Sequence, residues 1–399
     1  MKFLVKCFQL ITGGLAAVVI RLVRPIRHYR IGCLPSHEIG HYAANVEAYL
    51  CERDAGVGGH SKESIDIWYR NPSACVSNTQ LDKMWKRTIR ISNSPMTKYI
   101  DAVSRRLPGG STYTIQHHDR DAYALSNKSE PHLKFIETEE VDGQNFLRSI
   151  QTYPEQKFIC LAVRDSSYKR EQFASRDNDK DNYRNNDISN YETVARNLAD
   201  SGYLVIRMGA KVERPFVVDH LNVIDYATNG MRSEFLDIYL GAKCEMFVST
   251  ALGIDEIAKV FRRPRVFTNY LPIGNFGKCG PGDLIIPKQY WLNSESRFLT
   301  FSEIVSFNFN LASCTSSYEY QLAGITLVEN TPTEILEATR ERLSRIAGTW
   351  TTTAENEARR VGFWSFYYRL SPPAIRSNVE RQEPIIGSAF LRDNPHWTI

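Results

Sequence analysis

The chain has 399 residues, of which 42% are hydrophobic and 24% are charged, and its formal net charge is +4. This composition excludes a disordered or fully membrane-embedded protein, and the length predicts two domains. Nucleic acid is not expected as a partner, because proteins that bind it concentrate basic residues on one face. The eight cysteines never form C-x-x-C, so we expect reduced thiols and no thiolate metal site.

Residues 1–28 combine an apolar run at 10–20 with basic residues on both sides. The run is shorter than the roughly 20 residues that cross a bilayer. We expect a basic, apolar N-terminal helix that lies on a membrane surface, which places the protein in the cytoplasm, peripheral at the inner face of the cell membrane. A buried first helix and a signal peptide are the alternatives. The basic residues that flank or follow the run are Lys2, Lys6, Arg21, Arg24, Arg27 and Arg30.

The first domain is expected over residues 29–154. Residues 29–34 and 64–69 are strand candidates, and apolar residues recur at helical spacing in 39–53, 80–91 and 97–106. Residues 108–142 are polar and predict a loop region. This domain is the less regular of the two.

The second domain is expected over residues 155–350. The apolar run at 157–163 is typical of a parallel strand that is covered on both faces. Further strands are expected at 203–207, 223–226, 245–249 and 264–268, with helices at 191–201, 232–242 and 253–261. This alternation predicts right-handed βαβ units and a Rossmann-like parallel sheet.

The end of the chain is expected to be helical and then extended. Thr331 as N-cap, Pro332 and Glu334 predict the start of a helix over residues 331–347. Residues 351–399 are expected to form a further helix at 354–368 and a polar surface tail.

Ligands of an open parallel sheet bind beyond the carboxyl ends of its strands. This rule selects Arg164, after the first strand of the second domain, and Arg207, at the end of the next one. Two arginines at this edge would neutralise a diphosphate, although each alone is as readily a surface ion pair. The turn after strand 245–249 would offer backbone amides to phosphate and acids to ribose hydroxyls. Its residues of interest are Ser249, Thr250, Gly253, Asp255 and Glu256.

Three stretches of the chain resemble a bacterial family of glycosyltransferases from polysaccharide biosynthesis regions. They are YRNNDISNYETVARNLADSGYLVIRMG, FLDIYLGAKCEMFVSTALGIDEIAKVFRRP and ENTPTEI. In the first domain, GHYAANVEAYL is similar to that family's N-terminal block. The resemblance implies a GT-B-like α/β fold of two Rossmann-like domains with a cleft between them. The matching positions are Arg207, Gly209, Ser249, Gly253 and Glu256 on the donor side, and Gly40, His41, Asn45 and Glu47 in the first domain.

The resemblance also implies an activity, the transfer of a sugar from a nucleotide-diphosphate donor to a surface-glycan or lipid-linked acceptor. Arginines and helix amides would stabilise the leaving group, so neither a metal nor a cofactor is expected. Histidine suits the base that takes the acceptor's proton; His41 is the first choice, with His37 and Glu38 as alternatives. A nucleotide-sugar 2-epimerase of the same fold and a non-catalytic glycan-binding protein remain open.

Residues 37–41, HEIGH, also match the HExxH pattern of zinc metallopeptidases. On a helix, His37 and His41 would share one face and bind zinc while Glu38 activated water. The metzincin continuation would need glycine and histidine where this chain has Ala44 and Glu47. A proline two residues before His37 places it in a turn, which disfavours this alternative.

Overall fold

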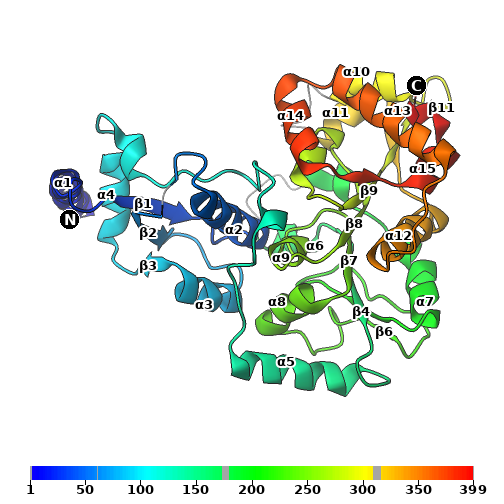
Figure 1. Cartoon of the computed structure of the whole chain (residues 1–399), viewed down its shortest axis with the longest axis horizontal. Helices are drawn as coiled ribbons and strands as arrows, with labels where there is room; N and C mark the ends of the chain where they lie inside the picture. Colours follow the sequence, from blue (N-terminus) through cyan, green and yellow to red (C-terminus); the bar gives the residue numbers. More distant parts are fainter. Residues whose placement is uncertain (1, 61, 173–178, 309–315, 399) are drawn as a thin grey trace. The chain divides into compact units, whose positions relative to one another are not determined.

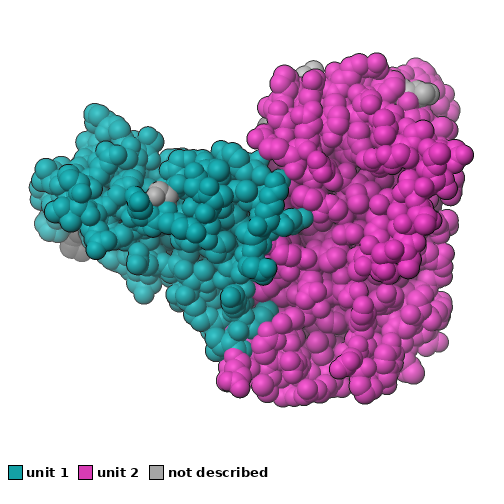
Figure 2. All heavy atoms as spheres, viewed as in Figure 1, with its two compact units in different colours: residues 1–136 teal, residues 137–399 magenta. Residues whose placement is uncertain are grey.

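The computed structural model describes residues 2–60, 62–172, 179–308 and 316–398. Two compact units make up the chain, residues 1–136 and 137–399 (Figure 2). Each has a parallel sheet with helices around it, which confirms the expected α/β class (Figure 1). The boundary precedes the expected one near residue 154, because helix α5 (Glu137–Ile150) packs on the second unit. One contact that holds α5 is the ion pair of Glu140 Oε1 with Lys243 Nζ at 2.6 Å.

The sheet of unit 1 has three parallel strands in the order β1-β2-β3. They are β1 (Tyr29–Leu34), β2 (Ile65–Arg70) and β3 (Arg90–Ser92). Both expected strands are present. Strand β3 falls partly inside an expected helix, because α3 ends at Thr88 and Ile89 is already extended. The helices are α1 (Lys2–Leu22), α2 (Ile39–Ala55), α3 (Thr79–Thr88) and α4 (Met96–Ser104), followed by short 3-10 turns at Gly110–Tyr113 and Ser126–Lys128.

A buried ion pair joins the first two strands of unit 1. Arg30 Nε lies 2.9 Å from Asp66 Oδ1, and its Nη2 donates to Tyr49 Oη at 2.7 Å. Arg30 is only 4% exposed, so it belongs to the core of the unit. The sequence grouped it with the cations that flank the N-terminal helix, and that grouping is wrong for this residue.

The main sheet of unit 2 has seven parallel strands in the order β13-β9-β8-β7-β4-β5-β6. Counted along the chain from β4, this is the 3-2-1-4-5-6 order of a Rossmann fold with one strand added at the edge. The strands are β4 (Phe158–Ala162), β5 (Leu204–Arg207), β6 (Val223–Ile224), β7 (Met246–Ser249), β8 (Arg265–Tyr270), β9 (Leu284–Pro287) and β13 (Ile385–Ile386). The order in which the strands are added along the chain reverses between β4 and β7, which is the point where such sheets bind ligands.

The central strand β4 is buried on both faces, as its continuous apolar run predicts. Its residues alternate between two cores: Phe158 and Cys160 pack with Leu236 and Leu240 of α8, and Ile159 packs in the other core with residues of α7 and α12. The helices of unit 2 are α6 (Ser167–Gln172), α7 (Glu192–Asp200), α8 (Glu234–Lys243), α9 (Asp255–Val260), α10 (Phe301–Asn308), α11 (Ser317–Leu322), α12 (Pro332–Ile346), α13 (Ala354–Leu370), α14 (Pro373–Gln382) and α15 (Ser388–Asp393).

Helix α12 begins with the capping box that its sequence predicts. Thr331 Oγ1 accepts from the Glu334 amide at 3.2 Å, and the Glu334 carboxylate accepts from the Thr331 amide at 2.8 Å. Before it, a small antiparallel sheet in the order β11-β10-β12 was not expected. Its strands are β10 (Gln289–Leu292), β11 (Arg297–Phe298) and β12 (Ile325–Val328).

The C-terminal segment is part of the core and not a surface tail, so that prediction is wrong. Strand β13 pairs with β9 at the edge of the main sheet. Phe390, Leu391 and Trp397 are almost fully buried in the larger core of unit 2. The sequence did not reveal these buried residues, because polar residues separate them and they are too few to show a helical or strand periodicity.

Candidate functional site

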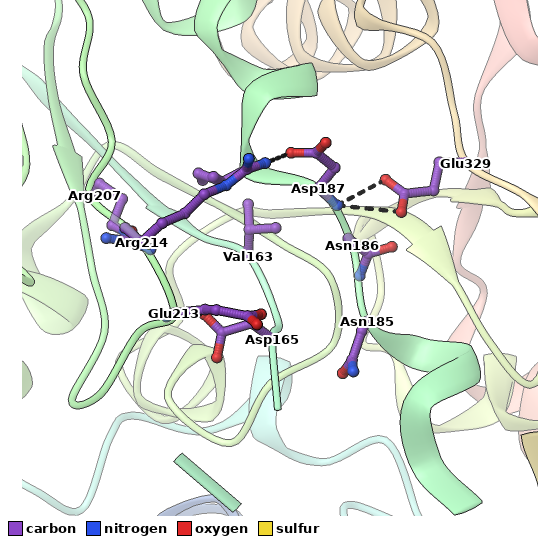
Figure 3. Close-up of a pocket in the computed structure, with 10 residues that line it drawn as sticks. Val163, Asp165, Asn185, Asn186, Asp187, Arg207, Glu213, Arg214 and Glu329 are labelled. Atoms are coloured by element: carbon purple, nitrogen blue, oxygen red, sulfur yellow. Dashed lines mark hydrogen bonds and ion pairs between the residues drawn. The ribbon is translucent and has the colours of Figure 1, made fainter. Parts of the chain in front are cut away.

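A hollow of about 480 Å³ opens at the carboxyl ends of the neighbouring strands β4 and β5 (Figure 3). Parallel strands end at one edge of the sheet, so the loops that follow them converge there. The hollow is lined by Val163, Asp165, Asn185, Asn186, Asp187, Ile188, Arg207, Glu213, Arg214 and Glu329. Of the residues that the sequence selected, Arg207 lies in this lining.

Arg207 is the last residue of β5 and is 1% exposed. Its Nη1 forms an ion pair with Asp225 Oδ1 at 2.9 Å, and its Nη2 donates to the carbonyl of Arg214 at 3.4 Å. Its Nε is buried and has no hydrogen-bond partner among the described residues. A buried N–H without an acceptor costs about 1–3 kcal/mol, so this guanidinium has unused capacity for an oxygen of a ligand.

Arg164 lies two residues beyond β4 and is 7% exposed. Its backbone amide donates to Thr250 Oγ1 at 2.8 Å, which joins the ends of β4 and β7. Asp181 is 3.9 Å from Nη2, and Nε has no hydrogen-bond partner within the described part of the chain. Burial, and then the charge of Arg184, lower the pKa of Arg164 to about 10. This cation is therefore incompletely neutralised by the protein.

Arg184 was not selected from the sequence, but like Arg164 and Arg207 it has a buried Nε without a hydrogen-bond partner among the described residues. Its Nη2 donates to the carbonyl of Ala251 at 2.6 Å. The segment that carries it connects β4 to α7 and therefore crosses the carboxyl edge of the sheet. That position in a strand-to-helix connection is the signal that could have selected it.

The turn after β7 is held by Asp255. Ser249 Oγ donates to Asp255 Oδ2 at 2.5 Å, and the Leu252 amide donates to the same oxygen at 2.6 Å. Asp255 Oδ1 also lies 3.6 Å from Nη1 of Arg265, as does Glu256 Oε2. Burial and the charge of Glu256 raise the pKa of Asp255 to about 6.

This arrangement gives Asp255 and Glu256 partners inside unit 2, where they are 1% and 6% exposed. The structure does not bring them into the hollow with Arg207. Thr250 and Gly253 also lie outside the hollow's lining, in the turn beside it. Gly209 follows β5, and a Cβ there would lie 2.6 Å from Val212 Cγ1, so the close return of this loop requires glycine.

Four carboxylates surround the arginines of the hollow. Asp165 Oδ2 accepts from the Glu213 amide at 2.8 Å, and Glu329 accepts from the Asp187 amide at 3.0 and 3.2 Å. Asp187 also forms an ion pair with Arg214 (Figure 3). These bonds hold three connecting segments together. Carboxylate oxygens that line a hollow accept hydrogen bonds from hydroxyl groups, so the lining suits a ligand with hydroxyls beside an anionic group.

Lys288 directly follows β9, is 4% exposed and contacts two residues of the hollow's lining. Its Nζ donates to the carbonyl of Asn185 at 2.7 Å and lies 3.9 Å from Glu329 Oε1. Burial lowers the pKa of Lys288 to about 8 and raises the pKa of Glu329. The ammonium group of Lys288 therefore places one more cation near Asn185, at a position where burial disfavours its charge.

In unit 1, the HEIGH segment begins helix α2. Glu38 is the N-cap residue with extended φ and ψ of −127° and 117°, so His37 precedes the helix and His41 lies in its first turn. His41 Nδ1 is 3.1 Å from Glu38 Oε2, its Nε2 is 3.5 Å from Asp119 Oδ1, and its side chain is 38% exposed. Within the described residues, the one group of possible metal ligands is Glu47, Cys51 and His132, which excludes both histidines of the motif. The geometry therefore does not form a zinc-peptidase site.

The other expected residues of unit 1 are buried in α2. Asn45 Oδ1 accepts from the backbone and from Nη1 of Arg120 at 3.1 and 3.2 Å. Glu47 Oε2 lies 3.2 Å from His132 Nδ1. Gly40, like these two, has little exposure. The two polar side chains hold the segment at 120–132 against the helix.

Of the comparisons with known proteins, the one with solved structures finds matches to this chain. No family model and no curated protein matches the chain. Similar solved structures include a glycosyl transferase of family 9 from Veillonella parvula, with 10% identity, 61% of this chain and 80% of that one covered, and a TM-score of 0.37. A second is E. coli ADP-heptose LPS heptosyltransferase II, with 14% identity, 61% of this chain and 86% of that one covered, and a TM-score of 0.33. A third is E. coli heptosyltransferase WaaC with ADP-2-deoxy-2-fluoro heptose, with 12% identity, 64% of this chain and 92% of that one covered, and a TM-score of 0.30. Their class is the one that the sequence resemblance predicts, and similarity at this level does not by itself transfer a function.

Proposed function

We propose that this chain is a metal-independent glycosyltransferase of GT-B type that binds a nucleotide-diphosphate sugar on unit 2. The observation that carries the proposal is the pair of buried arginines at the carboxyl edge of the sheet. Arg164 follows β4 and Arg207 ends the adjacent β5, and each keeps an Nε that no described residue satisfies. A diphosphate supplies oxygens for such donors, and forked guanidinium contacts hold it well.

The chemistry of transfer makes these cations useful. Negative charge grows on the nucleoside diphosphate as the glycosidic bond breaks, and fixed positive groups in a water-poor site stabilise it. The carboxylates of the hollow, such as Asp187 and Glu329, suit the hydroxyls of a ribose or a sugar. That the donor is a nucleotide sugar and the acceptor a surface glycan or a lipid-linked glycan follows from the sequence resemblance.

For the base, we propose His41. The carboxylate of Glu38 at 3.1 Å orients the imidazole, as acids do for catalytic histidines. Its partial exposure leaves the ring accessible to an acceptor. His37 and Glu38 are the alternatives on the same turn, and Gly40, Asn45 and Glu47 support its helix.

We also propose that helix α1 attaches the protein to a membrane surface. No helix of the described residues is long and apolar enough to span a membrane. One stripe of α1 is nonetheless apolar and exposed, at i, i+3 and i+4 spacing: Phe8, Ile11, Leu15, Val18, Val19 and Leu22. The opposite side packs on α4, where Gly13 lies close to Tyr99.

The stripe and its neighbouring charges fit the headgroup region of an anionic bilayer. Arg24 and Arg27 follow the helix, while Arg21 is held over the ring of Tyr113 at 4.3 Å. Among the described residues, Cys33, Cys51, Cys75, Cys160, Cys244 and Cys279 are not in disulfides, as in a reducing compartment. The apolar stripe with its basic neighbours and the reduced cysteines both suit the cytoplasmic face of a cell membrane.

Nucleotide binding tests the first proposal. Calorimetry of the full chain with UDP, GDP, ADP and CMP, with and without EDTA, should show one preferred nucleoside diphosphate whose affinity is unchanged by the chelator. Arg207→Met and Arg164→Met should each weaken that affinity at least tenfold, while the exposed control Arg381→Met should not. Equal affinity in the arginine variants, or binding that EDTA abolishes, would contradict the proposal. Conversion of the sugar without any acceptor would favour the epimerase instead.

Vesicle sedimentation tests the membrane proposal. The full chain should bind vesicles that contain anionic lipid, more weakly as salt rises. Ile11→Glu with Val18→Glu should abolish binding, and Val361→Glu, at an exposed apolar residue of unit 2, should leave it unchanged. Equal sedimentation of both variants would rule out α1 as the attachment site.

A further inference from the structure

We propose that Glu47, Cys51 and His132 of unit 1 form a zinc-binding site. Glu47 and Cys51 are one turn apart on the same face of α2. His132 approaches them from the segment that follows the 3-10 turn Ser126–Lys128. Each side chain offers one ligand atom, and the three atoms lie within 4.8 Å of one another.

The residue types and their spacing fit zinc. Zn²⁺ binds thiolate sulfur at about 2.3 Å and imidazole nitrogen or carboxylate oxygen at about 2.0–2.2 Å. Tetrahedral coordination at those lengths puts ligand atoms roughly 3.3–3.6 Å apart. Here His132 Nδ1 is 3.2 Å from Glu47 Oε2, and Cys51 Sγ is 3.8 Å from Glu47 Oε1. Shifts of a few tenths of an ångström would therefore accommodate the ion.

The other nitrogen of the histidine supplies an independent argument. His132 Nε2 lies 3.4 Å from Asp54 Oδ2. Metal-binding histidines usually direct their second ring nitrogen to a carboxylate in this way, which fixes the ring orientation.

The burial of the cluster also favours a metal ion at this site. His132 Nδ1 is buried and lies near Glu47 without meeting hydrogen-bond geometry. The side chains of Glu47 and His132 are 3% and 15% exposed, so water does little to satisfy that nitrogen. A metal ion would occupy its lone pair and neutralise the carboxylate. Three protein ligands leave a fourth position for water or for the Ser129 hydroxyl, which is 3.1 Å from Cys51 Sγ.

In this arrangement zinc fastens residues 129–132 to α2, the helix whose first turn carries His41. The site lies in unit 1, and the proposed diphosphate contacts lie in unit 2. Metal binding and nucleotide binding can therefore fail separately. The competing interpretation is a metal-free cluster of hydrogen bonds.

Metal content and cobalt spectroscopy distinguish a zinc site from a metal-free cluster of hydrogen bonds. The full chain, purified without chelator, should contain one equivalent of zinc, and the protein with Co²⁺ in its place should show a thiolate-to-cobalt charge-transfer band. Cys51→Ser and His132→Gln should each weaken zinc binding at least tenfold, and Asp54→Asn should weaken it 10–100-fold. Cys33→Ser and Cys75→Ser, at free thiols of the same unit, are the matched controls.

The proposal would be overturned by the absence of stoichiometric metal in a folded wild-type chain supplied with zinc or cobalt, or by full zinc affinity in folded Cys51→Ser. If a variant does not fold, the wild-type stoichiometry and the charge-transfer band still give the answer. A charge-transfer band that disappears in Cys33→Ser or Cys75→Ser instead would place the metal elsewhere and equally contradict the assignment.

Discussion

The backbone amide of Arg164 donates a hydrogen bond to Thr250 Oγ1 at 2.8 Å, so one side chain joins the carboxyl ends of β4 and β7. This is the point at which the strand order of the sheet changes direction, and it positions the buried Arg164 guanidinium. We expect Thr250→Val, which keeps the shape but removes the acceptor, to lower the free energy of unfolding by about 1–3 kcal/mol. Denaturant unfolding measures this, and Thr250→Ser should stay near wild type. A loss in Thr250→Ser together with wild-type stability in Thr250→Val would mean that the methyl group matters and the hydroxyl does not.

Asp225 neutralises the buried Arg207 and also accepts from the Phe216 amide at 2.8 Å. Asp225→Ala leaves a buried cation without its partner, which should cost about 3–5 kcal/mol of unfolding free energy. The double variant Asp225→Ala with Arg207→Met should lose less than the sum of the single losses, because the unpaired charge is gone. Strictly additive losses in denaturant unfolding would show that the two side chains do not depend on each other.

Lys288 should make stability depend on alkaline pH. Its pKa in the folded chain is about 8 because of burial, against 10.5 ordinarily. Between these values the unfolded chain binds more protons, so the free energy of unfolding should rise with pH from about 8 to 10.5. Relative to Lys288→Met, which lacks this group, the rise should reach about 3 kcal/mol. Parallel stability curves for the two proteins would show that this lysine is not depressed.

Gly143 fixes helix α5 to unit 2, because a methyl group at this position would overlap the ring of Tyr239. Gly143→Ala should therefore loosen α5 at a cost of about 1–3 kcal/mol, so that trypsin can cleave the helix after the exposed Arg148. The second substitution Tyr239→Ala in the same chain should remove the overlap. Limited proteolysis that is unchanged in Gly143→Ala would contradict the docking of α5.

His41 is expected to act in turnover and not in donor binding. His41→Gln should lower kcat by about 10²–10⁴-fold, the usual contribution of a general base, while the nucleotide affinity measured by calorimetry stays constant. His37→Gln is the neighbouring control and should retain most of the rate. The opposite pattern would assign the base to His37.

The sequence by itself determined the strands of both units that have strong apolar runs, the capping box at Thr331, and the two arginines beside the carboxyl ends of adjacent strands. These features are local, because a run of apolar residues or a cap depends on neighbours a few positions away. The rule that ligands meet strand carboxyl ends then placed Arg164 and Arg207 without knowledge of the path of the chain.

Only the tertiary structure decided which polar groups meet. Asp255 looked available to a ribose, but the fold pairs it with Arg265 inside the unit. Strand β13 looked like a tail, since its two residues gain their place only by pairing with β9. Cys51 and His132 are far apart in sequence and belong to no motif, and the path of the chain brings them together beside Glu47. Contacts between distant residues depend on how every intervening element packs, which no local pattern encodes.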